Sequence, residues 1–199
     1  KYSLFEAGTR VPFITYWKDK IKPQVSDKMV SQMDLLNSIA SLLGSDKRSG
    51  DGEDLSGVFF KNSGEGRTEL IIEAQSRTAY KNEDWVMIPP YPGPAVSASV
   101  NIELGNSENY QLYNLGEDIN QQQNLADKKP KKLEKMKARF QLKTERIKSE
   151  HATKAIELKK ENEKKIEDEK KLIVETISSS LLKHRSDGDD LAMHEVATE

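Results

Sequence analysis

Hydrophobic positions gather in short runs between Leu4 and Leu115 and become sparse beyond Phe140. The first long run, Val11 to Trp17, is rich in β-branched and aromatic residues and has little polarity. Such a run predicts a strand that is covered on both faces, as in an α/β sheet. Pro12 has no N–H to donate to a ladder, so it belongs among the first residues of that strand.

A helix is predicted next, and Gly44 is a natural end for it. Ser31, followed three residues later by Asp34, resembles a capping box with a shorter acid. The apolar positions of this helix recur at helical spacing and are expected to pack inward: Met33, Leu36, Ile39, Ala40 and Leu43. Residues 45–54 are rich in Gly, Ser and Asp and predict a solvated acidic loop, because their acids lack the EF-hand spacing of a calcium site.

A small antiparallel sheet is predicted after the glycine-rich break at Gly64 and Gly66. Residues 81–84 contain Asn and Asp and favour a hairpin reversal. The prolines of residues 89–94 cannot continue a ladder, and they predict an ordered loop rather than a proline-rich ligand for another domain. Residues 110–115 alternate as a further strand. The earlier strands are predicted at Glu69–Ala74, Ser76–Tyr80 and Trp85–Ile88.

A second helix is predicted to start near Pro130, whose missing N–H suits a first turn. Beyond Phe140, residues 141–183 are dominated by Lys and Glu, and pairs at helical spacing such as Glu161 with Lys165 support a solvated helical extension. The apolar positions of this extension hold no heptad register, so a coiled coil is not indicated. Residues 184–199 are expected to be a disordered tail. The packing stripe of the second helix is predicted to be Leu133, Met136, Lys137 and Phe140.

Composition narrows the functional classes. The chain has 199 residues, of which 35% are hydrophobic and 32% charged, so its core must be concentrated in one part of the chain. It has no cysteine, which excludes disulfides, thiolate metal sites and cysteine nucleophiles within it. Lysines cluster beyond Lys128, but acids are interleaved with them and the net charge is −2, so no nucleic-acid partner is expected. Neither a leader peptide nor a membrane span is evident.

Ordered motifs along the chain resemble one enzyme family. The row K-x-S-L-F-E-x-G-x-R-V-P-F-I at Lys1–Ile14 resembles a segment that sulfatases, including arylsulfatases, carry late in their catalytic domain. The patterns D-G-x-D-L-S-G at Asp51–Gly57 and Q-L-Y-N-L-x-E-D-x-x-Q-x-x-N-L-A at Gln111–Ala126 resemble later parts of the same family. The family usually has two glycines where this chain has Ala7 and Gly8.

The resemblance implies an α/β fold: the C-terminal fragment of an alkaline-phosphatase-like sulfatase domain, with a small antiparallel sheet and a packed helix, followed by a long charged helical tail. Residues 1–60 are then expected to end the catalytic domain, and residues 61–140 to form the sheet-and-helix subdomain. Residues 141–183 would be the charged helical extension and residues 184–199 the disordered tail. The chain is accordingly expected to be part of a longer polypeptide.

The resemblance also assigns one site residue, because the lysine that opens this row binds the sulfate ester in the family, and it matches Lys1. The family mechanism further needs a formylglycine nucleophile made from a C/S-x-P-x-R motif, and Asp or Asn ligands for calcium. This chain has no cysteine and no proline with Ser two residues before it. The parent protein is therefore expected to hydrolyse sulfate esters of small molecules or polysaccharides, and this chain alone to be inactive. The three histidines lie in the tail and are expected to be surface residues: His151, His184 and His194.

Three alternatives stay open at this point. The same superfamily contains phosphonate and phosphate ester hydrolases. A non-catalytic carbohydrate-binding module is a second class, and the charged tail makes a helical interaction protein a third. Family members are commonly exported or lysosomal, and substrate identity and oligomeric state are left undecided. The aromatic residues that would line a carbohydrate cleft are Tyr80, Trp85, Tyr91, Tyr110 and Tyr113.

Overall fold

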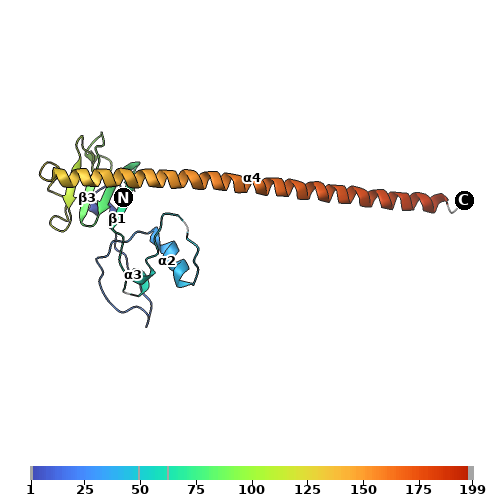
Figure 1. Cartoon of the computed structure of the whole chain (residues 1–199), viewed down its shortest axis with the longest axis horizontal. Coiled ribbons are helices and arrows are strands. Elements are labelled where there is room, and N and C mark those ends of the chain that lie inside the picture. The colour runs from blue at the N-terminus through green and yellow to red at the C-terminus, as the bar shows by residue number, and fades with distance from the viewer. Residues whose placement is uncertain (1, 49, 62, 197–199) are drawn as a thin grey trace. The chain divides into compact units, whose positions relative to one another are not determined.

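The computed structural model describes residues 2–48, 50–61 and 63–196, with side chains as far as Ser179. It divides into two units, Lys1–Gln141 and Leu142–Glu199. The sheet and the shorter helices belong to the first unit, and helix α4 (Pro130–Val196) begins in the first unit and continues as the second (Figure 1). None of the helices in the described part of the chain has a stretch apolar and long enough to cross a membrane.

The centre of the first unit is a four-stranded antiparallel sheet with the strand order β1-β2-β3-β6. Two tight reversals build it: Gln75 and Ser76 adopt positive φ between the first two strands, and Glu83 does so in the second reversal. Positive φ suits hairpin loops because their twist then matches that of the strands. The predicted hairpin is therefore confirmed. The strands are β1 (Glu69–Ala74), β2 (Arg77–Asn82), β3 (Trp85–Ile88) and β6 (Gln111–Asn114), and a separate pair consists of β4 (Val96–Ser97) and β5 (Ile102–Glu103).

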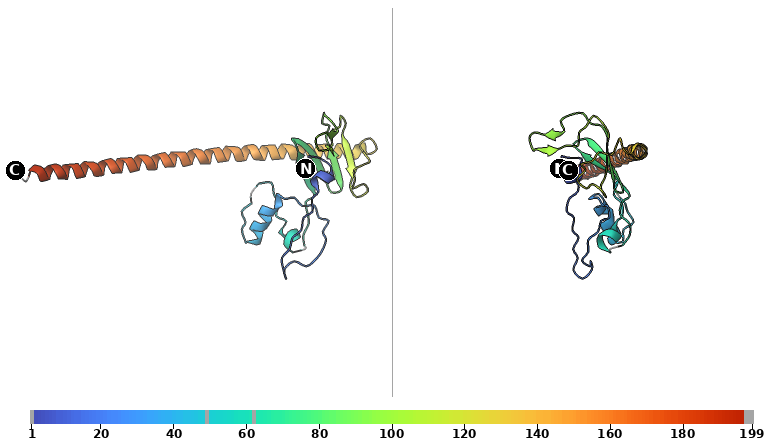
Figure 2. Two further views of the ribbon diagram at one scale, coloured as in Figure 1. Left: turned by 180° about the vertical axis from the view of Figure 1, so that it is seen from behind. Right: turned by 90° about the vertical axis from the view of Figure 1, so that its left-hand side faces the viewer.

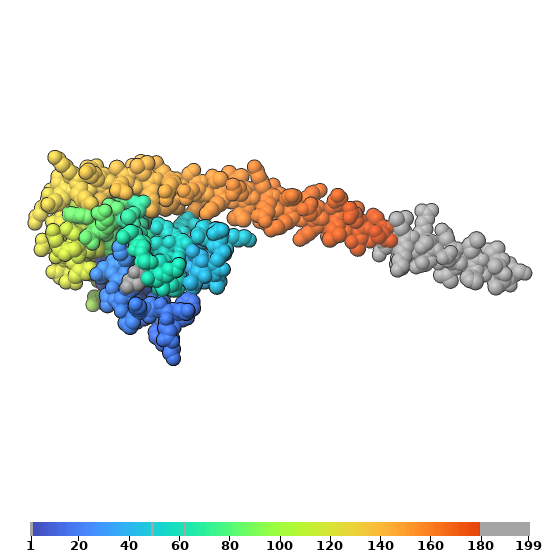
Figure 3. Space-filling model, turned by 60° about the horizontal axis from the view of Figure 1, so that its bottom comes forward, coloured from blue at the N-terminus to red at the C-terminus, as the bar shows by residue number. Residues whose placement is uncertain are grey.

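Each face of the four-stranded sheet is covered by a different end of the first unit. The first turns of α4 pack on one face. In the space-filling view they lie directly against the sheet region (Figure 3). Leu4 lies on the other face, where Phe5 packs beside it. The predicted packing stripe of the second helix is confirmed at its apolar positions, because Met136 is buried and Leu133 and Phe140 pack against the same cluster. Lys137 is only half-buried and lies over the ring of Tyr110.

The strand predicted for Val11 to Trp17 is wrong. These residues form an extended segment without ladder partners, and Val11 and Ile14 are 73% and 87% exposed. Figure 2 shows this part of the chain as a loop that stands apart from the sheet. A strand needs a neighbouring strand to pair its backbone groups, and the described part of the chain offers none here. Before it lies a single helical turn, α1 (Glu6–Thr9).

The helix predicted before Gly44 is confirmed as α2 (Asp34–Leu42), and a short helix α3 (Ser56–Phe60) follows it. The packing face predicted for α2 is wrong, because Leu36 and Leu43 are 62% and 78% exposed while polar side chains of this helix are buried. The buried residues of α2 are Asp34, Asn37 and Ser38. Helical periodicity shows that a helix has two faces, but it does not decide which face meets the rest of the protein.

The charged extension is helical, as predicted for residues 141–183. The helical backbone runs on to Val196, through most of the region for which the sequence predicts disorder, and residues 197–199 lie outside the described part. Once a helix is nucleated, each further residue adds a hydrogen bond for one more residue ordered. A packed first turn is such a nucleus, and Pro130 to Phe140 provides it.

Candidate functional site

Lys1, the sulfate-binding residue implied by the resemblance, lies outside the described residues, but the segment that follows it is well defined. Leu4 is 1% exposed and Ser3 is also buried. Gly8 lies so close to Ser3 that a Cβ on Gly8 would be 2.7 Å from the Cβ of Ser3. The family has two glycines where this chain has Ala7 and Gly8. The glycine that this chain retains, Gly8, is the one whose contact with Ser3 leaves no room for a Cβ.

The sheet subdomain holds this segment by its backbone. The N–H of Leu4 donates to the carbonyl of Leu104 at 3.3 Å. The guanidinium of Arg77, on β2, donates to the carbonyls of Tyr2 at 2.9 Å and Leu104 at 3.1 Å. The carbonyl of Tyr2, immediately after Lys1, is therefore tied to a strand more than seventy residues away in the sequence.

A second set of contacts surrounds Glu6. Its N–H donates to Oε1 of Gln121 at 2.7 Å, and its buried carboxylate accepts from Nζ of Lys81 at 3.2 Å. The guanidinium of Arg10 lies 3.8 Å from the same carboxylate. The Nε2 donor of Gln121 is buried and has no hydrogen-bond partner among the described residues. This cluster therefore has one donor left for a further acceptor.

A buried ion pair organises the region around α2. The Nε of Arg67 donates to Oδ1 and Oδ2 of Asp34 at 3.0 Å and 2.9 Å, and its Nη1 reaches Glu53 at 3.0 Å. Burial acts to raise the pKa of Asp34, but the hydrogen bonds from Arg67 and from two backbone N–H groups outweigh it and hold this pKa below its ordinary value. Asp34 is thus ionised, and its carboxylate accepts hydrogen bonds from Arg67 and from the backbone N–H groups of Ser31 and Glu53.

The same polar face of α2 ties down the loop predicted to be solvated. Asp34 accepts from the N–H groups of Ser31 and Glu53, both at 2.8 Å. The contact with Ser31 is one half of the expected capping box, but Ser31 does not cap α2, because the helix begins after Met33 and has no side-chain cap hydrogen bond. The side chain of Asn37 donates to the carbonyl of Gly52 at 2.6 Å, and the loop is therefore attached to the helix. Among the described residues, no group of three His, Cys, Asp or Glu side chains is placed to hold a metal ion. We conclude that this acidic cluster is structural.

The sequence did not reveal the partnership of Arg67 with Asp34 or that of Gln121 with Glu6. Both pairs join residues that are far apart in the chain. The capping pattern at Ser31 and Asp34 signals that the carboxylate has a local role, yet it contains nothing about the arginine. Single-sequence patterns report local periodicity, and contacts of this kind depend on the tertiary fold.

The five aromatic residues considered for a carbohydrate cleft do not come together. Tyr80 is fully buried beneath α4, where its hydroxyl donates to Glu69, and Trp85 and Tyr110 pack at the margins of the same cluster. Tyr113 lies on the opposite face, and burial raises the pKa of its hydroxyl to about 12. Tyr91 packs beside it. The aromatic-cleft alternative is therefore wrong, because these rings belong to two separate cores.

Of the histidines, His151 lies on an exposed turn of α4. His184 and His194 lie beyond the residues whose side chains are described. His151 therefore belongs to the second unit, and no group of three His, Cys, Asp or Glu side chains in the described part of the chain is placed to hold a metal ion.

Comparison with known proteins agrees with the sequence resemblance. Residues 1–45 match the family model called Sulfatase. A curated relative, the N-acetylgalactosamine-6-O-sulfatase of Bacteroides thetaiotaomicron, is 32% identical over 134 residues, which are 65% of this chain and 26% of the relative. The chain therefore spans about a quarter of the length of the curated relative it matches.

A solved structure is similar as well. It is described as concerning the metabolism of multiple glycosaminoglycans by Bacteroides thetaiotaomicron, and it is 29% identical with a TM-score of 0.67. The similarity covers 71% of this chain and 30% of that one. Family model, relative and structure point the same way, and together they support the reading of this chain as a fragment similar to part of a sulfatase chain.

Proposed function

We propose that this chain forms part of an enzyme that hydrolyses sulfate esters of carbohydrates, and that Lys1 binds the sulfate group. The observation that carries the proposal is the 32% identity to a protein named N-acetylgalactosamine-6-O-sulfatase. The anchoring of the segment from Tyr2 to Glu6 supports it, because a ligand-binding residue works best on a rigid base. The remaining parts of the proposed enzyme would belong to an α/β domain of the alkaline-phosphatase-like superfamily.

The role proposed for Lys1 is electrostatic. Its ammonium would offset the negative charge that develops on the sulfate oxygens as the S–O bond breaks. Lysine suits this role because it is a compact point charge on a flexible stem. Tyr2, tied by its carbonyl to Arg77, would hold the backbone from which that stem extends.

The nucleophile and the calcium ion that the family mechanism uses are not assigned to residues of this chain. It contains no cysteine, and among its described residues no acidic cluster fits a metal ion. The described residues therefore do not fit a calcium site, and no step proposed for them passes through one. Their contribution is to bind the sulfate and to fix the position of Lys1.

An exposed apolar surface supports the view that further sulfatase polypeptide packs here. Val11, Ile14 and Tyr16 are largely exposed, and so are Leu36 and Leu43 on the outer side of α2. Large apolar side chains that gather on a surface are typical of a face that another polypeptide covers, and these residues come from two segments of the first unit. We infer that this surface is covered in the proposed enzyme, and that the extended segment from Val11 gains its ladder partners there.

The test is a sulfate-ester assay on two proteins: the 199-residue chain, and the polypeptide that carries this chain together with any residues encoded before Lys1. We expect no turnover by the chain alone and turnover by the longer protein. Turnover by the chain alone would overturn the proposal that it holds only part of the site. Preference of the longer protein for a phosphate ester would favour the related phosphate ester hydrolases instead.

A substitution then tests the assigned lysine. In the longer protein, Lys1→Ala should lower kcat/KM by about a hundredfold or more, as loss of a preorganised charge in an active site commonly does. The matched control is Lys154→Ala, which removes an exposed lysine from α4. Equal activity of the two variants would remove Lys1 from the proposed site.

A further inference from the structure

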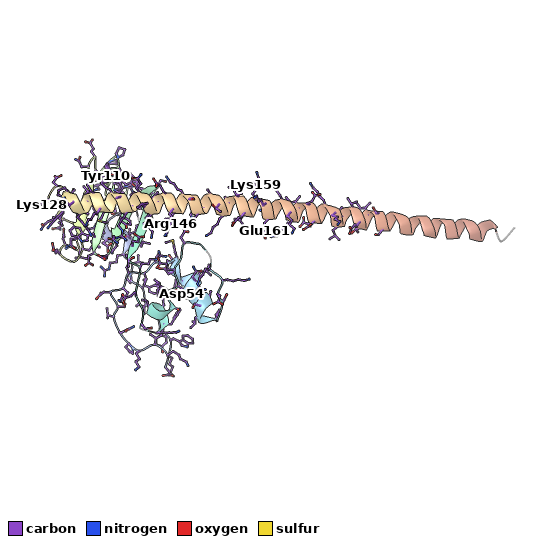
Figure 4. All side chains as sticks on the ribbon, viewed as in Figure 1. Asp54, Tyr110, Lys128, Arg146, Lys159 and Glu161 are labelled. Atoms are coloured by element: carbon purple, nitrogen blue, oxygen red, sulfur yellow. The ribbon has the colours of Figure 1, made fainter. Side chains whose placement is uncertain are left out.

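A row of cations lies along the start of α4, and we call it the basic stripe. Its five residues carry one positive charge each, and Glu134 is the one acid among residues 128–139. Lys131, Lys135 and Arg139 are exposed, as is Lys128 just before the helix, where Figure 4 labels it. The basic stripe consists of Lys128, Lys131, Lys132, Lys135 and Arg139.

Helix geometry explains why these residues align. Lys131, Lys135 and Arg139 recur every four residues, so they lie above one another at about 6 Å per step. Met136 is buried against the sheet and Phe140 packs beside it, so Lys131 and Lys135 are exposed, whereas Lys132 and Arg139 lie on the flanks and reach side chains of the sheet. The packing of the apolar stripe therefore fixes the direction in which the basic stripe points.

The neighbouring acids do not neutralise the basic stripe. Glu134 is bound to Lys137 on the other flank of the helix, with 2.8 Å between its carboxylate and the Nζ. Arg139 has a distant partner in Glu69, at 3.9 Å. The lysines of the basic stripe have no carboxylate within ion-pair distance among the described residues. The acids that are interleaved in the sequence are thus separated from the basic stripe in the helix.

The basic stripe also rests on a rigid base. The Nζ of Lys132 lies 5.1 Å from the centre of the Trp85 ring, which favours a cation. Trp85 itself packs against the cluster beneath α4. Lys132 is half-buried and held in place, while the outer lysines remain free to move. One fixed cation among several mobile ones is suited to a flexible polyanion, which can be held at one point and contacted at others.

We propose that the basic stripe binds a linear sulfated polysaccharide. The proposal rests on the proposed function, because a sulfate-ester hydrolase acting on carbohydrates would meet polymers that carry several sulfates. The similarity to a sulfatase of a sulfated amino sugar, and to a structure concerned with glycosaminoglycans, favours such a polymer over other polyanions. Lysines in a row can each contact one of the successive sulfates as point charges, and this contact does not depend on the identity of the sugar that carries the sulfate.

The experiment measures binding of the 199-residue chain to chondroitin 6-sulfate, to the same polymer after chemical desulfation, and to duplex DNA. We expect the sulfated polymer to bind, with an affinity that falls steeply between about 50 and about 200 mM salt, because bound counterions are released on contact. Desulfation should abolish binding. No binding of the sulfated polymer at the lower salt concentration, or tighter binding of DNA, would overturn the proposal.

Two matched triple variants locate the site. Both remove three lysines from α4, and circular dichroism should show that both remain folded. The variant within the basic stripe should lose at least about tenfold in affinity, since each lost contact weakens polyanion binding severalfold. Equal losses in both variants would show that net charge alone matters and would overturn the proposal. The two variants are Lys128→Gln/Lys131→Gln/Lys135→Gln and the control Lys160→Gln/Lys164→Gln/Lys170→Gln.

This binding assay is independent of turnover. If the longer protein hydrolyses small sulfate esters but the basic stripe does not bind the polymer, the inference fails and the proposed function stands. If the polymer binds through the basic stripe but no sulfate ester is cleaved, the proposed function fails and the binding surface remains.

Discussion

Leu4→Ala is the substitution that most directly tests how the segment following Lys1 is held. Leu4 is 1% exposed and packs on the sheet face that α4 does not cover. Truncating a buried leucine removes its transfer free energy and leaves a cavity, which together cost about 3 kcal/mol. The variant should therefore unfold about 10 °C below the unsubstituted chain, given the usual relation for domains of this size. The side chains that would line the cavity come from the cluster of Ala74, Ala79, Val86, Ile88, Tyr113 and Leu115.

The assay is thermal and urea unfolding followed by circular dichroism and by tryptophan fluorescence. Trp17 and Trp85 both contribute to the fluorescence, and Trp85 reports on the sheet and the start of α4. Val11→Ala is the matched control, because it removes an apolar side chain that is largely exposed. Such a surface change should alter the free energy of unfolding by no more than about 0.5 kcal/mol. If Leu4→Ala costs no more than the control, Leu4 does not anchor the segment and the rigid base proposed for Lys1 is lost.

Three further predictions follow from other contacts. Arg67→Met leaves the buried carboxylate of Asp34 unpaired, which should lower the free energy of opening residues 31–55 by about 3–5 kcal/mol. Amide hydrogens in these residues should therefore exchange faster, and unchanged exchange would show that the pair is dispensable. The pKa of Asp34 is lowered in the folded state, so its contribution to stability is complete above about pH 4 and is lost as the pH falls through that lowered pKa. The free energy of unfolding of Asp34→Asn should therefore change less with pH below about pH 4 than that of the unsubstituted chain. Gly8→Ala places a Cβ 2.7 Å from Ser3 and should cost about 1–3 kcal/mol, measurable as a lower melting temperature, with Ala7→Ser at the exposed neighbour as the control.

Local patterns were sufficient for elements whose partners are close in the sequence. The hairpin of β2 and β3 follows from two short runs and a turn, since its ladder pairs neighbouring residues. The start of α4 follows from Pro130 and an apolar stripe at helical spacing, and Met136 on that stripe is indeed buried. The family resemblance at residues 1–14 likewise depends only on the order and spacing of residues.

Long-range contacts were beyond these patterns. The sequence shows that α2 has an apolar and a polar side, but the pairing of Asp34 with Arg67 decides that the polar side is the buried one. The same limit explains Val11 to Trp17, whose composition suits a strand although no ladder partner is present in the described part of the chain.

The sequence by itself thus predicted α2, the start of α4 and the hairpin strands, and indicated to which enzyme family the chain is related, because these features depend on residues near one another in the chain. Only the tertiary structure decided that Leu4 completes the second face of the sheet, and that Lys131 and Lys135 lie exposed on α4 while Arg139 reaches Glu69. The physical reason is that burial and the direction of a helix face depend on what a segment packs against, which a linear pattern does not contain.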